Sequence, residues 1–371
     1  INDILDFSKI EAGKLELAVD KTDLPQLLSQ VSDIVKHKID AQQVNFLVNE
    51  APGLPRYIWV DPVRVKQVLI NLLSNAIKFT REGEIELSVI IDSDDREEGY
   101  ATILFAVKDT GIGIPANKQQ KIFEAFSQED SSITRNYGGT GLGLTISNQL
   151  LGMMGTRLSL ESEPGKGSTF FFRLRVACAY QAREAPNPAS RYQKALIVAK
   201  HPRQLQIMKQ MLASQGIAGV TATDEPQAIQ MIRHTGDFDL LVAEHHLPFS
   251  DGIQFIEHLR NHPGITSRQL PVILVYSTDD DKHIKQACSE LQIQKALSHP
   301  LTTYRLREAL ISMQKQVEPE PVPRASEQNY TQAISLLIVD DNIMNRLVAK
   351  AMIEKAFPGS DILLAESGSE A

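Results

Sequence analysis

Residues 71–80 read NLLSNAIKFT and belong to a stretch whose apolar residues recur at helical spacing. On such a helix Asn71 and Asn75 are four residues apart and share one face, and Lys78 lies near that face. Two side-chain amides and an ammonium group placed in this way can hold phosphate oxygens and a hydrated Mg²⁺, which prefers oxygen ligands. The alternative is a solvated helix face that carries two asparagines by chance, and the stretch alone does not decide.

The segments around this helix alternate between helical and strand-like patterns. Asp61 stands where a helix N-cap belongs, with Pro62 at the first helical position. Further helices are expected over 24–41 and up to residue 154. Strands are expected over 44–48, 57–60, 85–91, 101–107, 157–161 and 168–176. This mixed order predicts an α/β sandwich with helices on one face of the sheet.

A second motif, DTGIGIP at residues 109–115, directly follows one of these strands. Gly111 and Gly113 allow the backbone to approach a flat ligand without a Cβ in the way. The carboxylate of Asp109 can accept a hydrogen bond from an exocyclic amine, such as that of adenine. A glycine-rich turn with a local Asx hydrogen bond is the plain alternative.

A third motif, GGTGLGL at residues 138–144, leads into a helix. Backbone N–H groups at a helix N-terminus bind anions, and the glycines allow the loop to close over phosphates. The motif lacks the Lys-Ser/Thr ending of a P-loop and follows no first strand of a dinucleotide-binding fold. A plain flexible loop is the alternative, which so dense a run of glycines before a helix disfavours.

Taken in order, these motifs resemble the N, G1, F and G2 boxes of histidine kinases, within the wider group of Bergerat-type ATPases. The resemblance covers about residues 1–176 and implies binding of ATP and Mg²⁺. It implies that Asn75 is the direct Mg²⁺ ligand, that Asn71 and Lys78 serve phosphate and catalysis, and that Asp109 holds the adenine amine. The further ATP-binding positions that it implies are Gly111, Gly113, Phe123, Phe126, Arg135, Gly139, Thr140, Gly141, Leu142 and Gly143.

The residue at position 71 separates two kinds of chemistry within this group. Hydrolases of the gyrase type need a glutamate on the first helix to activate water. In this chain the residue that resembles that position is Asn71. An amide cannot act as a general base. The resemblance therefore favours phosphoryl transfer over hydrolysis.

The first residues, INDILDFSKIEAGK at 1–14, resemble the second helix of the dimerisation and phosphotransfer hairpin of histidine kinases. The apolar stripe of this helix can be a core face or a dimer seam. No His box of the kind that accepts the phosphoryl group is present, so we expect the acceptor to lie upstream and read the chain as a fragment. The resemblance also implies a homodimer formed through that hairpin.

Composition sets limits on other functions. The net charge of −8 argues against nucleic-acid binding, and no apolar run approaches the roughly 18 residues that span a bilayer. The two cysteines, Cys178 and Cys288, fit neither a disulfide framework nor a zinc site. We expect the chain to be the cytoplasmic portion of a membrane-anchored protein of the bacterial inner membrane.

Residues 194–316 alternate short buried-type strands with amphipathic helices, which predicts a parallel doubly wound, flavodoxin-like sheet. They resemble a response-regulator receiver domain, because LPFSDG at 247–252 is similar to the loop after the family's phosphoacceptor. The resemblance places Glu244 at the acceptor position, Ala199 and Lys200 near the acidic pair, and His299 at the lysine position. We therefore expect a degenerate receiver with a scaffolding or regulatory role. The alternative is that Glu244 mimics a phosphorylated state.

Residues 336–342, LLIVDDN, resemble the start of an intact receiver, with Asp340 and Asp341 as an incomplete Mg²⁺ site. So short a piece cannot bury a sufficient core, so we expect it to be disordered or poorly packed. The predicted boundaries are 1–19 for the hairpin end and linker, 20–178 for the ATP-binding domain, 179–193 for a linker, 194–316 for the degenerate receiver, 317–334 for a Pro/Glu-rich linker and 335–371 for the truncated receiver.

Three functions compete. The first is a hybrid sensor histidine kinase of a two-component phosphorelay, which passes the ATP γ-phosphoryl group to a His and then to a receiver Asp on a response regulator or phosphotransfer partner. The second is a Bergerat-type hydrolase or chaperone-like ATPase, which Asn71 and the receiver segments disfavour. The third is a non-catalytic signalling module, which the complete nucleotide motifs disfavour.

Overall fold

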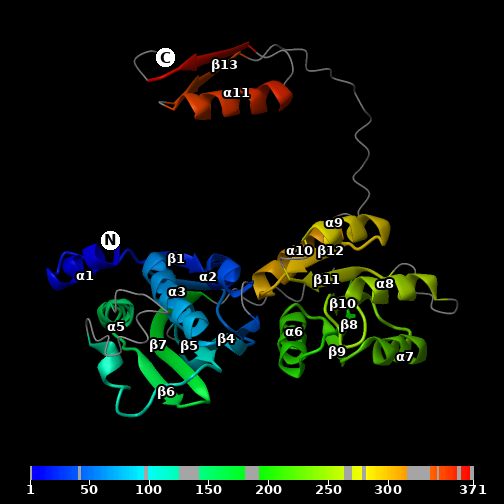
Figure 1. The fold of residues 1–371 in the computed structure, drawn as a ribbon, viewed down its shortest axis with the longest axis horizontal. Helices are drawn as coiled ribbons and strands as arrows, with labels where there is room; N and C mark the ends of the chain where they lie inside the picture. Colours follow the sequence, from blue (N-terminus) through cyan, green and yellow to red (C-terminus); the bar gives the residue numbers. More distant parts are fainter. Residues whose placement is uncertain are drawn as a thin grey trace. The chain divides into compact units, whose positions relative to one another are not determined.

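The computed structural model describes residues 2–40, 43–95, 99–124, 142–179, 192–262, 270–277, 281–315, 335–340, 342–356 and 361–367. The chain divides into two compact units, residues 1–317 and residues 318–371. The first unit contains a seven-stranded sheet followed along the chain by a five-stranded sheet (Figure 1). None of the helices in the described ranges is long and apolar enough to cross a membrane.

The seven-stranded sheet has the order β1-β3-β7-β5-β4-β2, with β6 paired to β7. All its pairs are antiparallel except β2 with β4. Buried and more exposed side chains alternate along β5, so one face of the sheet carries the core. The strands are β1 (Asp20–Asp23), β2 (Gln43–Glu50), β3 (Tyr57–Val60), β4 (Glu82–Asp95), β5 (Tyr100–Asp109), β6 (Ser159–Glu163) and β7 (Gly167–Ala179).

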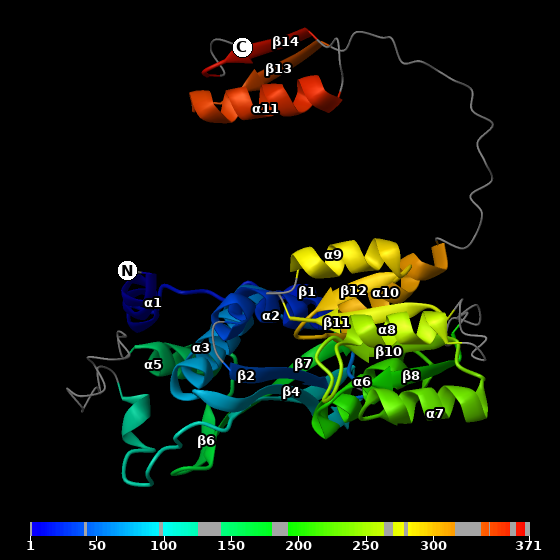
Figure 2. The same ribbon diagram turned by 45° about the vertical axis from the view of Figure 1, so that its right-hand side comes forward.

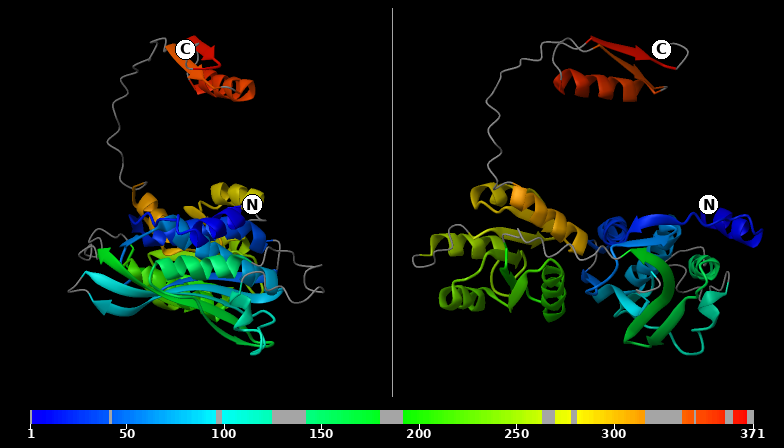
Figure 3. Two further views of the ribbon diagram at one scale, coloured as in Figure 1. Left: turned by 90° about the vertical axis from the view of Figure 1, so that its left-hand side faces the viewer. Right: turned by 180° about the vertical axis from the view of Figure 1, so that it is seen from behind.

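The helices of this part form a layer against that sheet (Figure 3). They are α1 (Asn2–Glu11), α2 (Leu24–Asp40), α3 (Pro62–Phe79), the short 3₁₀ helix η2 (Lys121–Phe123) and α5 (Gly143–Met153). The predicted start of α3 is confirmed, because Asp61 accepts hydrogen bonds from the Val63 and Arg64 amides and Pro62 follows it. The expected α/β sandwich is therefore present; we refer to residues 20–179 as the ATPase-like domain.

The apolar stripe of α1 divides between the two roles left open by the sequence. Phe7 and Ile10 pack against the core of the ATPase-like domain, whereas Leu5 is 54% exposed. Asp6 anchors the helix, because it pairs with Arg64 at 3.3 Å and accepts a hydrogen bond from Gln67 at 2.9 Å. The helix is thus attached to α3, and the face that carries Leu5 is exposed, as a dimer seam would require.

The five-stranded sheet is parallel throughout, with the order β12-β11-β10-β8-β9. Core residues from α6 and α10 cover one face, and those from α7, α8 and α9 cover the other, as expected for a doubly wound sheet. Its elements are β8 (Lys194–Val198), α6 (Pro202–Ser214), β9 (Ala218–Ala222), α7 (Glu225–Thr235), β10 (Leu240–Glu244), α8 (Gly252–Asn261), β11 (Val272–Tyr276), α9 (Asp281–Glu290), β12 (Lys295–Ser298) and α10 (Thr303–Lys315). We call this part the receiver-like domain.

The second unit contains β13 (Ser335–Val339), α11 (Ile343–Ala356) and β14 (Asp361–Ala365), with the two strands paired in parallel. Of the two expected outcomes, disorder or poor packing, these elements show the second, because β13 and β14 are paired along one edge of each strand. Their packing is poor. Leu337, Leu347 and Leu363 are 47%, 51% and 62% exposed, so the apolar faces of the unit have little cover.

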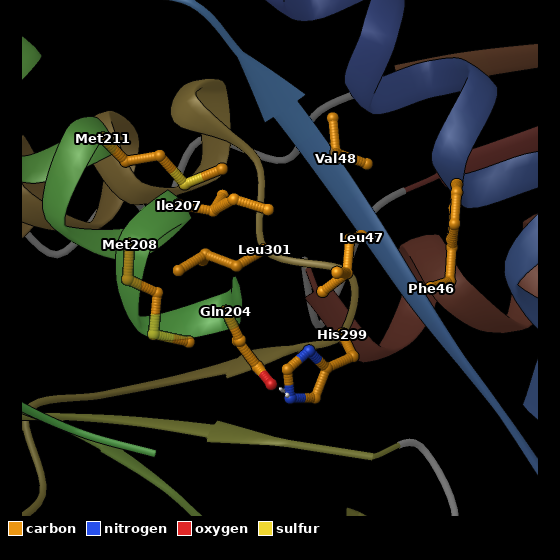
Figure 4. A pocket seen from close by; sticks show the side chains of 9 residues that line it. All are labelled: Phe46, Leu47, Val48, Gln204, Ile207, Met208, Met211, His299 and Leu301. Carbon is orange, nitrogen blue, oxygen red and sulfur yellow. Dashed lines mark hydrogen bonds between the residues drawn. The ribbon is translucent and has the colours of Figure 1, made fainter. Parts of the chain in front are cut away.

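An edge strand of the ATPase-like domain packs against the receiver-like domain. Strand β2 contacts α6, and α2 contacts α10 (Figures 2 and 3). Leu47 on β2 is only 5% exposed and belongs to the core cluster of the receiver-like domain. Figure 4 shows this side chain facing Ile207 and Leu301, and the cavity that remains there is about 10 Å³, which is at the limit of holding one water.

Polar contacts surround this apolar centre. Arg203 donates to both oxygens of Glu86, at 3.0 and 2.6 Å. Burial raises the pKa of Glu86, but the hydrogen bonds from Arg203 and Asn49 outweigh burial and hold that pKa below its ordinary value. The contact is therefore a charged, bidentate pair, the strongest type of side-chain hydrogen bonding at such a surface.

Glu50, at the end of β2, gives this interface a pH dependence. It accepts a hydrogen bond from the Thr303 amide at 3.0 Å, and burial raises its pKa from 4.5 to about 7, with a small contribution from Asp23. At pH values between 4.5 and 7 the folded chain binds more protons at Glu50 than the unfolded chain does. We therefore expect the free energy of unfolding to fall by about 3 kcal/mol as pH rises from 4.5 to 7.

Urea unfolding at several pH values tests this pH dependence. Glu50→Gln is expected to remove that part of the slope, and an unchanged slope would contradict the assignment.

Candidate functional site

Helix α3 and the start of α5 meet at Asn71. The Asn71 side-chain amide donates to the Ser147 hydroxyl on α5 at 2.9 Å. A Cβ on Gly143, the first residue of α5, would lie 2.3 Å from Asn71 Oδ1. The absence of a side chain at Gly143 therefore lets the α5 N-terminus approach α3, and the Asn71 carbonyl oxygen points at that N-terminus.

Asp109 ends strand β5 in a buried position, 5% exposed. Its Oδ1 accepts a hydrogen bond from the Gly111 amide at 2.8 Å. Burial raises the pKa of Asp109 above its ordinary value, and hydrogen bonds from the Gly111 and Ser168 amides oppose that rise. Protein donors thus fix the orientation of a buried carboxylate at the strand end, as a site for an exocyclic amine requires.

The glycines around Asp109 are required by close backbone approach. A Cβ on Gly111 would lie 2.4 Å from the carbonyl oxygen of Phe79, the last residue of α3. Gly113 has φ +68°, and a Cβ there would lie 2.1 Å from the Glu163 carbonyl oxygen. The motif at 109–115 is therefore clamped between the end of α3 and the turn after β6.

Gly113→Ala tests this clamp. Alanine at positive φ is strained, and its Cβ would also meet the Glu163 carbonyl, so we expect a loss of roughly 2–4 kcal/mol in the free energy of unfolding. Gly155→Ala is the matched control, since Gly155 has φ +77° and a Cβ on it would meet nothing within 4 Å. Thermal or urea unfolding should show a clearly smaller loss for Gly155→Ala; equal losses would mean that the contact with Glu163 contributes nothing.

The remaining predicted ATP-site residues fall into two groups. Asn75 and Lys78 are half-buried on α3, and the Lys78 ammonium lies 5.0 Å from the centre of the Phe79 ring. Phe123 packs against the core from η2, and its carbonyl accepts a hydrogen bond from the Thr145 hydroxyl of α5 at 3.1 Å, while Leu142 is buried. Phe126, Arg135, Gly139, Thr140 and Gly141 lie outside the described residues.

The structure adds residues that the motifs did not indicate. Ser147 is buried beneath Asn71. Gly167 has φ +100°, and a Cβ there would lie 1.9 Å from the Asp109 carbonyl oxygen. Ser162 donates to the Gly167 carbonyl and accepts from the Ile114 amide. The pair of glycines at 165 and 167 before a strand was the available sequence signal, whereas a single serine in a helix gives none.

In the receiver-like domain, Glu244 ends β10 and is 9% exposed. Its Oε2 accepts from the Lys200 amide at 3.2 Å, and its Oε1 lies 3.2 Å from His299 Nε2. Burial raises the pKa of Glu244, but the hydrogen bond and charge of His299 and the Lys200 amide outweigh burial, so the pKa lies below its ordinary value. Glu244, the Lys200 backbone and His299 thus lie together, with a glutamate and a histidine where the receiver resemblance expects an aspartate and a lysine.

In the second unit, Asp340 directly follows β13 and accepts a hydrogen bond from the Asn342 amide at 2.8 Å. The Asn345 side chain donates to the same carboxylate at 3.3 Å. Asp341 lies outside the described residues. The role of these two residues as a Mg²⁺ pair stays a prediction.

Comparison with known families matches both sheets. Residues 60–177 match the family described as histidine kinase-, DNA gyrase B- and HSP90-like ATPase. Residues 195–311 match the response regulator receiver domain. A solved structure of full-length ShkA in complex with AMPPNP has a similar fold, with a TM-score of 0.64 and 24% identity, covering 100% of this chain and 72% of that chain.

Curated sensor kinases are similar to this chain. The chain is 32% identical to the sensor protein GacS of Pseudomonas syringae pv. syringae over 99% of its own length and 40% of that protein. It is 31% identical to the autoinducer 2 sensor kinase/phosphatase LuxQ of Vibrio vulnificus over 84% of its length and 36% of LuxQ. It is 40% identical to the histidine-protein kinase BarA of Escherichia coli K12 over 47% of its length and 19% of BarA. The chain spans at most 40% of the length of these relatives.

The chain joins an ATPase domain of the histidine kinase type to a receiver domain, and it belongs with the hybrid sensor histidine kinases.

Proposed function

We propose that this chain binds Mg-ATP in the ATPase-like domain and donates the γ-phosphoryl group to a His on an upstream helical hairpin. In that step the bond between the γ-phosphorus and the bridging oxygen of ADP breaks. A bond from phosphorus to an imidazole nitrogen forms, and ADP leaves. A receiver Asp on a response regulator or a phosphotransfer partner then takes the phosphoryl group.

The observation that carries this proposal is that the second and third motifs both pack against α3, the helix that carries the first motif. Asn71 contacts Gly143 and Ser147 at the start of α5, and Gly111 packs on the last carbonyl of α3. The start of α5 therefore lies beside Asn71, and the Asp109 motif lies at the end of α3, about 12 Å further along the helix. A nucleotide needs these same features, which are an acceptor for the adenine amine, oxygen ligands for a metal and N–H donors for phosphate.

The residues present fit Mg²⁺ and ATP. The Asn71 amide group donates to Ser147 and its carbonyl oxygen faces the start of α5, so this side chain lies beside the N–H groups proposed to bind phosphate. Asn75, one helical turn further, would supply the amide oxygen that ligates Mg²⁺, which accepts oxygen ligands, and Lys78 would meet a phosphate oxygen. Bound Mg²⁺ would neutralise charge on the transferring phosphoryl group. The protein would position the triphosphate for transfer. It would not activate water, because the amide side chain of Asn71 cannot act as a general base.

The experiment is transfer of label from γ-labelled ATP to a separately supplied, His-bearing helical hairpin. We expect label on the hairpin and little free phosphate. Release of free phosphate without a labelled hairpin would support the hydrolase alternative. Nucleotide binding with neither product would support the non-catalytic signalling module.

The rest of the chain is proposed to serve this relay. We propose the boundaries given by the sequence: 1–19, 20–178, 179–193, 194–316, 317–334 and 335–371. The receiver-like domain is proposed to be degenerate, because Glu244 already has partners on both oxygens. Saturable binding of beryllofluoride with Mg²⁺ at Glu244 would contradict the proposal that this domain is degenerate. The parent protein is proposed to be a homodimer through the upstream hairpin and to be anchored in the bacterial inner membrane, with this chain on the cytoplasmic side.

A further inference from the structure

The contact between the two domains of the first unit uses a short segment of the receiver-like domain, residues 298–305. Ser298 accepts a hydrogen bond from the buried Lys36 ammonium at 2.7 Å. The Thr303 amide donates to Glu50 at 3.0 Å, and Arg305 pairs with Asp33. The segment therefore contacts both α2 and the end of β2, and we call it the docking segment.

The apolar centre of the same contact lies between the docking segment and α6. Leu47 of β2 packs among Ile207, Met208 and Leu301, side chains of the receiver-like core (Figure 4). A buried leucine contributes about 1.5–3 kcal/mol of transfer free energy. An exposed edge strand with apolar residues on both faces would otherwise be a site for aggregation, and this contact covers it.

The degenerate acceptor site is built into the docking surface. His299, the second residue of the docking segment, lies 3.2 Å from Glu244 Oε1 and 3.3 Å from Gln204 Nε2. Gln204 is 3% exposed and follows Arg203, which holds Glu86 of the ATPase-like domain. A buried carboxylate is costly unless it is paired, so the His299 contact with Glu244 constrains the docking segment.

We infer that the receiver-like domain is an intramolecular partner of the ATPase-like domain, docked on β2 and α2, and that the Glu244–His299 pair holds the docking segment in place without a phosphoryl group. In this arrangement, the changed acceptor residues perform a different task from phosphoryl transfer. Glu244 and His299 are positioning residues that join the end of β10 to the docking segment. This docking does not depend on the proposed transfer reaction.

Charge reversal in the full chain tests the docking. Arg203→Glu would face Glu86 with a second carboxylate, and we expect amide hydrogen exchange in β2 (residues 43–50) to rise about tenfold or more. Adding Glu86→Arg should restore the slow exchange. Arg173→Glu is the matched control, because the Arg173–Asp92 pair at 3.1 Å lies within the ATPase-like domain. Unchanged β2 exchange in Arg203→Glu, or failure of the double variant to restore it, would overturn the docking.

A second pair of variants tests the role of His299. We expect His299→Ala to raise exchange in both the docking segment and β2, whereas His299→Gln, which can still donate to Glu244, keeps most of the protection. Exchange in β10 (residues 240–244) should stay slow in both variants. If His299→Ala leaves β2 protected, or if β10 loses protection equally, the pair does not position the docking segment and that part of the inference is wrong.

Discussion

Asn75→Ala is expected to reduce phosphoryl transfer to a His-bearing hairpin by about 100-fold or more, the cost of removing one preorganised group that stabilises transferring charge. Asn75 lies one turn after Asn71 on the same face of α3, and the contacts of Asn71 with Ser147 and Gly143 place that face at the start of α5. Loss of its amide oxygen would leave the proposed Mg²⁺ with one protein ligand fewer. Calorimetry with Mg-ATP and transfer from γ-labelled ATP measure the two consequences.

The matched control is Ser74→Ala, a polar-to-alanine change at the preceding position of α3. It should bind and transfer like the unchanged chain. Thermal unfolding should be similar for both variants, because Asn75 is only half-buried. If Asn75→Ala transfers normally, or if Ser74→Ala is equally impaired, Asn75 is not the metal ligand that the histidine kinase resemblance implies.

The sequence predicted the parts of this fold that have a strong periodic or punctuating pattern. Helix α3 has an apolar stripe, an aspartate cap and a proline at its start, so its first residue was predicted correctly. Strands β1, β9 and β12 read DKTD, AGVTA and KALS, and were not predicted. These strands are held by backbone pairing with neighbours distant in sequence, and their polar or small side chains give no alternation.

The candidate site also contains some residues that the sequence predicted and others that it did not. The ligand-facing residues carry unusual types in unusual density, so Asn71, Asp109 and the glycines could be found from the sequence. Ser147 supports Asn71 through one hydrogen bond that depends on how α5 crosses α3, which no local pattern encodes. Leu47 is a related case. The apolar run of residues 46–48 indicates a strand buried on both faces, but the second covering surface belongs to the receiver-like domain far along the chain.

Asp109→Asn is expected to weaken ATP binding by about 100-fold while preserving the shape of the side chain. The carboxylate already accepts from the Gly111 and Ser168 amides, and it would accept from the adenine amine as well. An asparagine has a single acceptor oxygen and adds an N–H₂ donor. Whichever way the amide turns, one donor meets another donor in a buried place, which costs roughly 1–3 kcal/mol for each unsatisfied group.

Inosine triphosphate separates recognition of the amine from a general loss of structure, because it carries a carbonyl where adenine carries the amine. The unchanged chain should prefer ATP, since two acceptors would face each other in the inosine complex. Asp109→Asn should lose or reverse this preference, because its amide can donate to the inosine carbonyl. Asp92→Asn, which alters a partly exposed carboxylate paired with Arg173, is the control and should keep the preference for ATP. An equal loss of affinity for both nucleotides in Asp109→Asn would mean that Asp109 supports the turn at Gly111 and does not read the base.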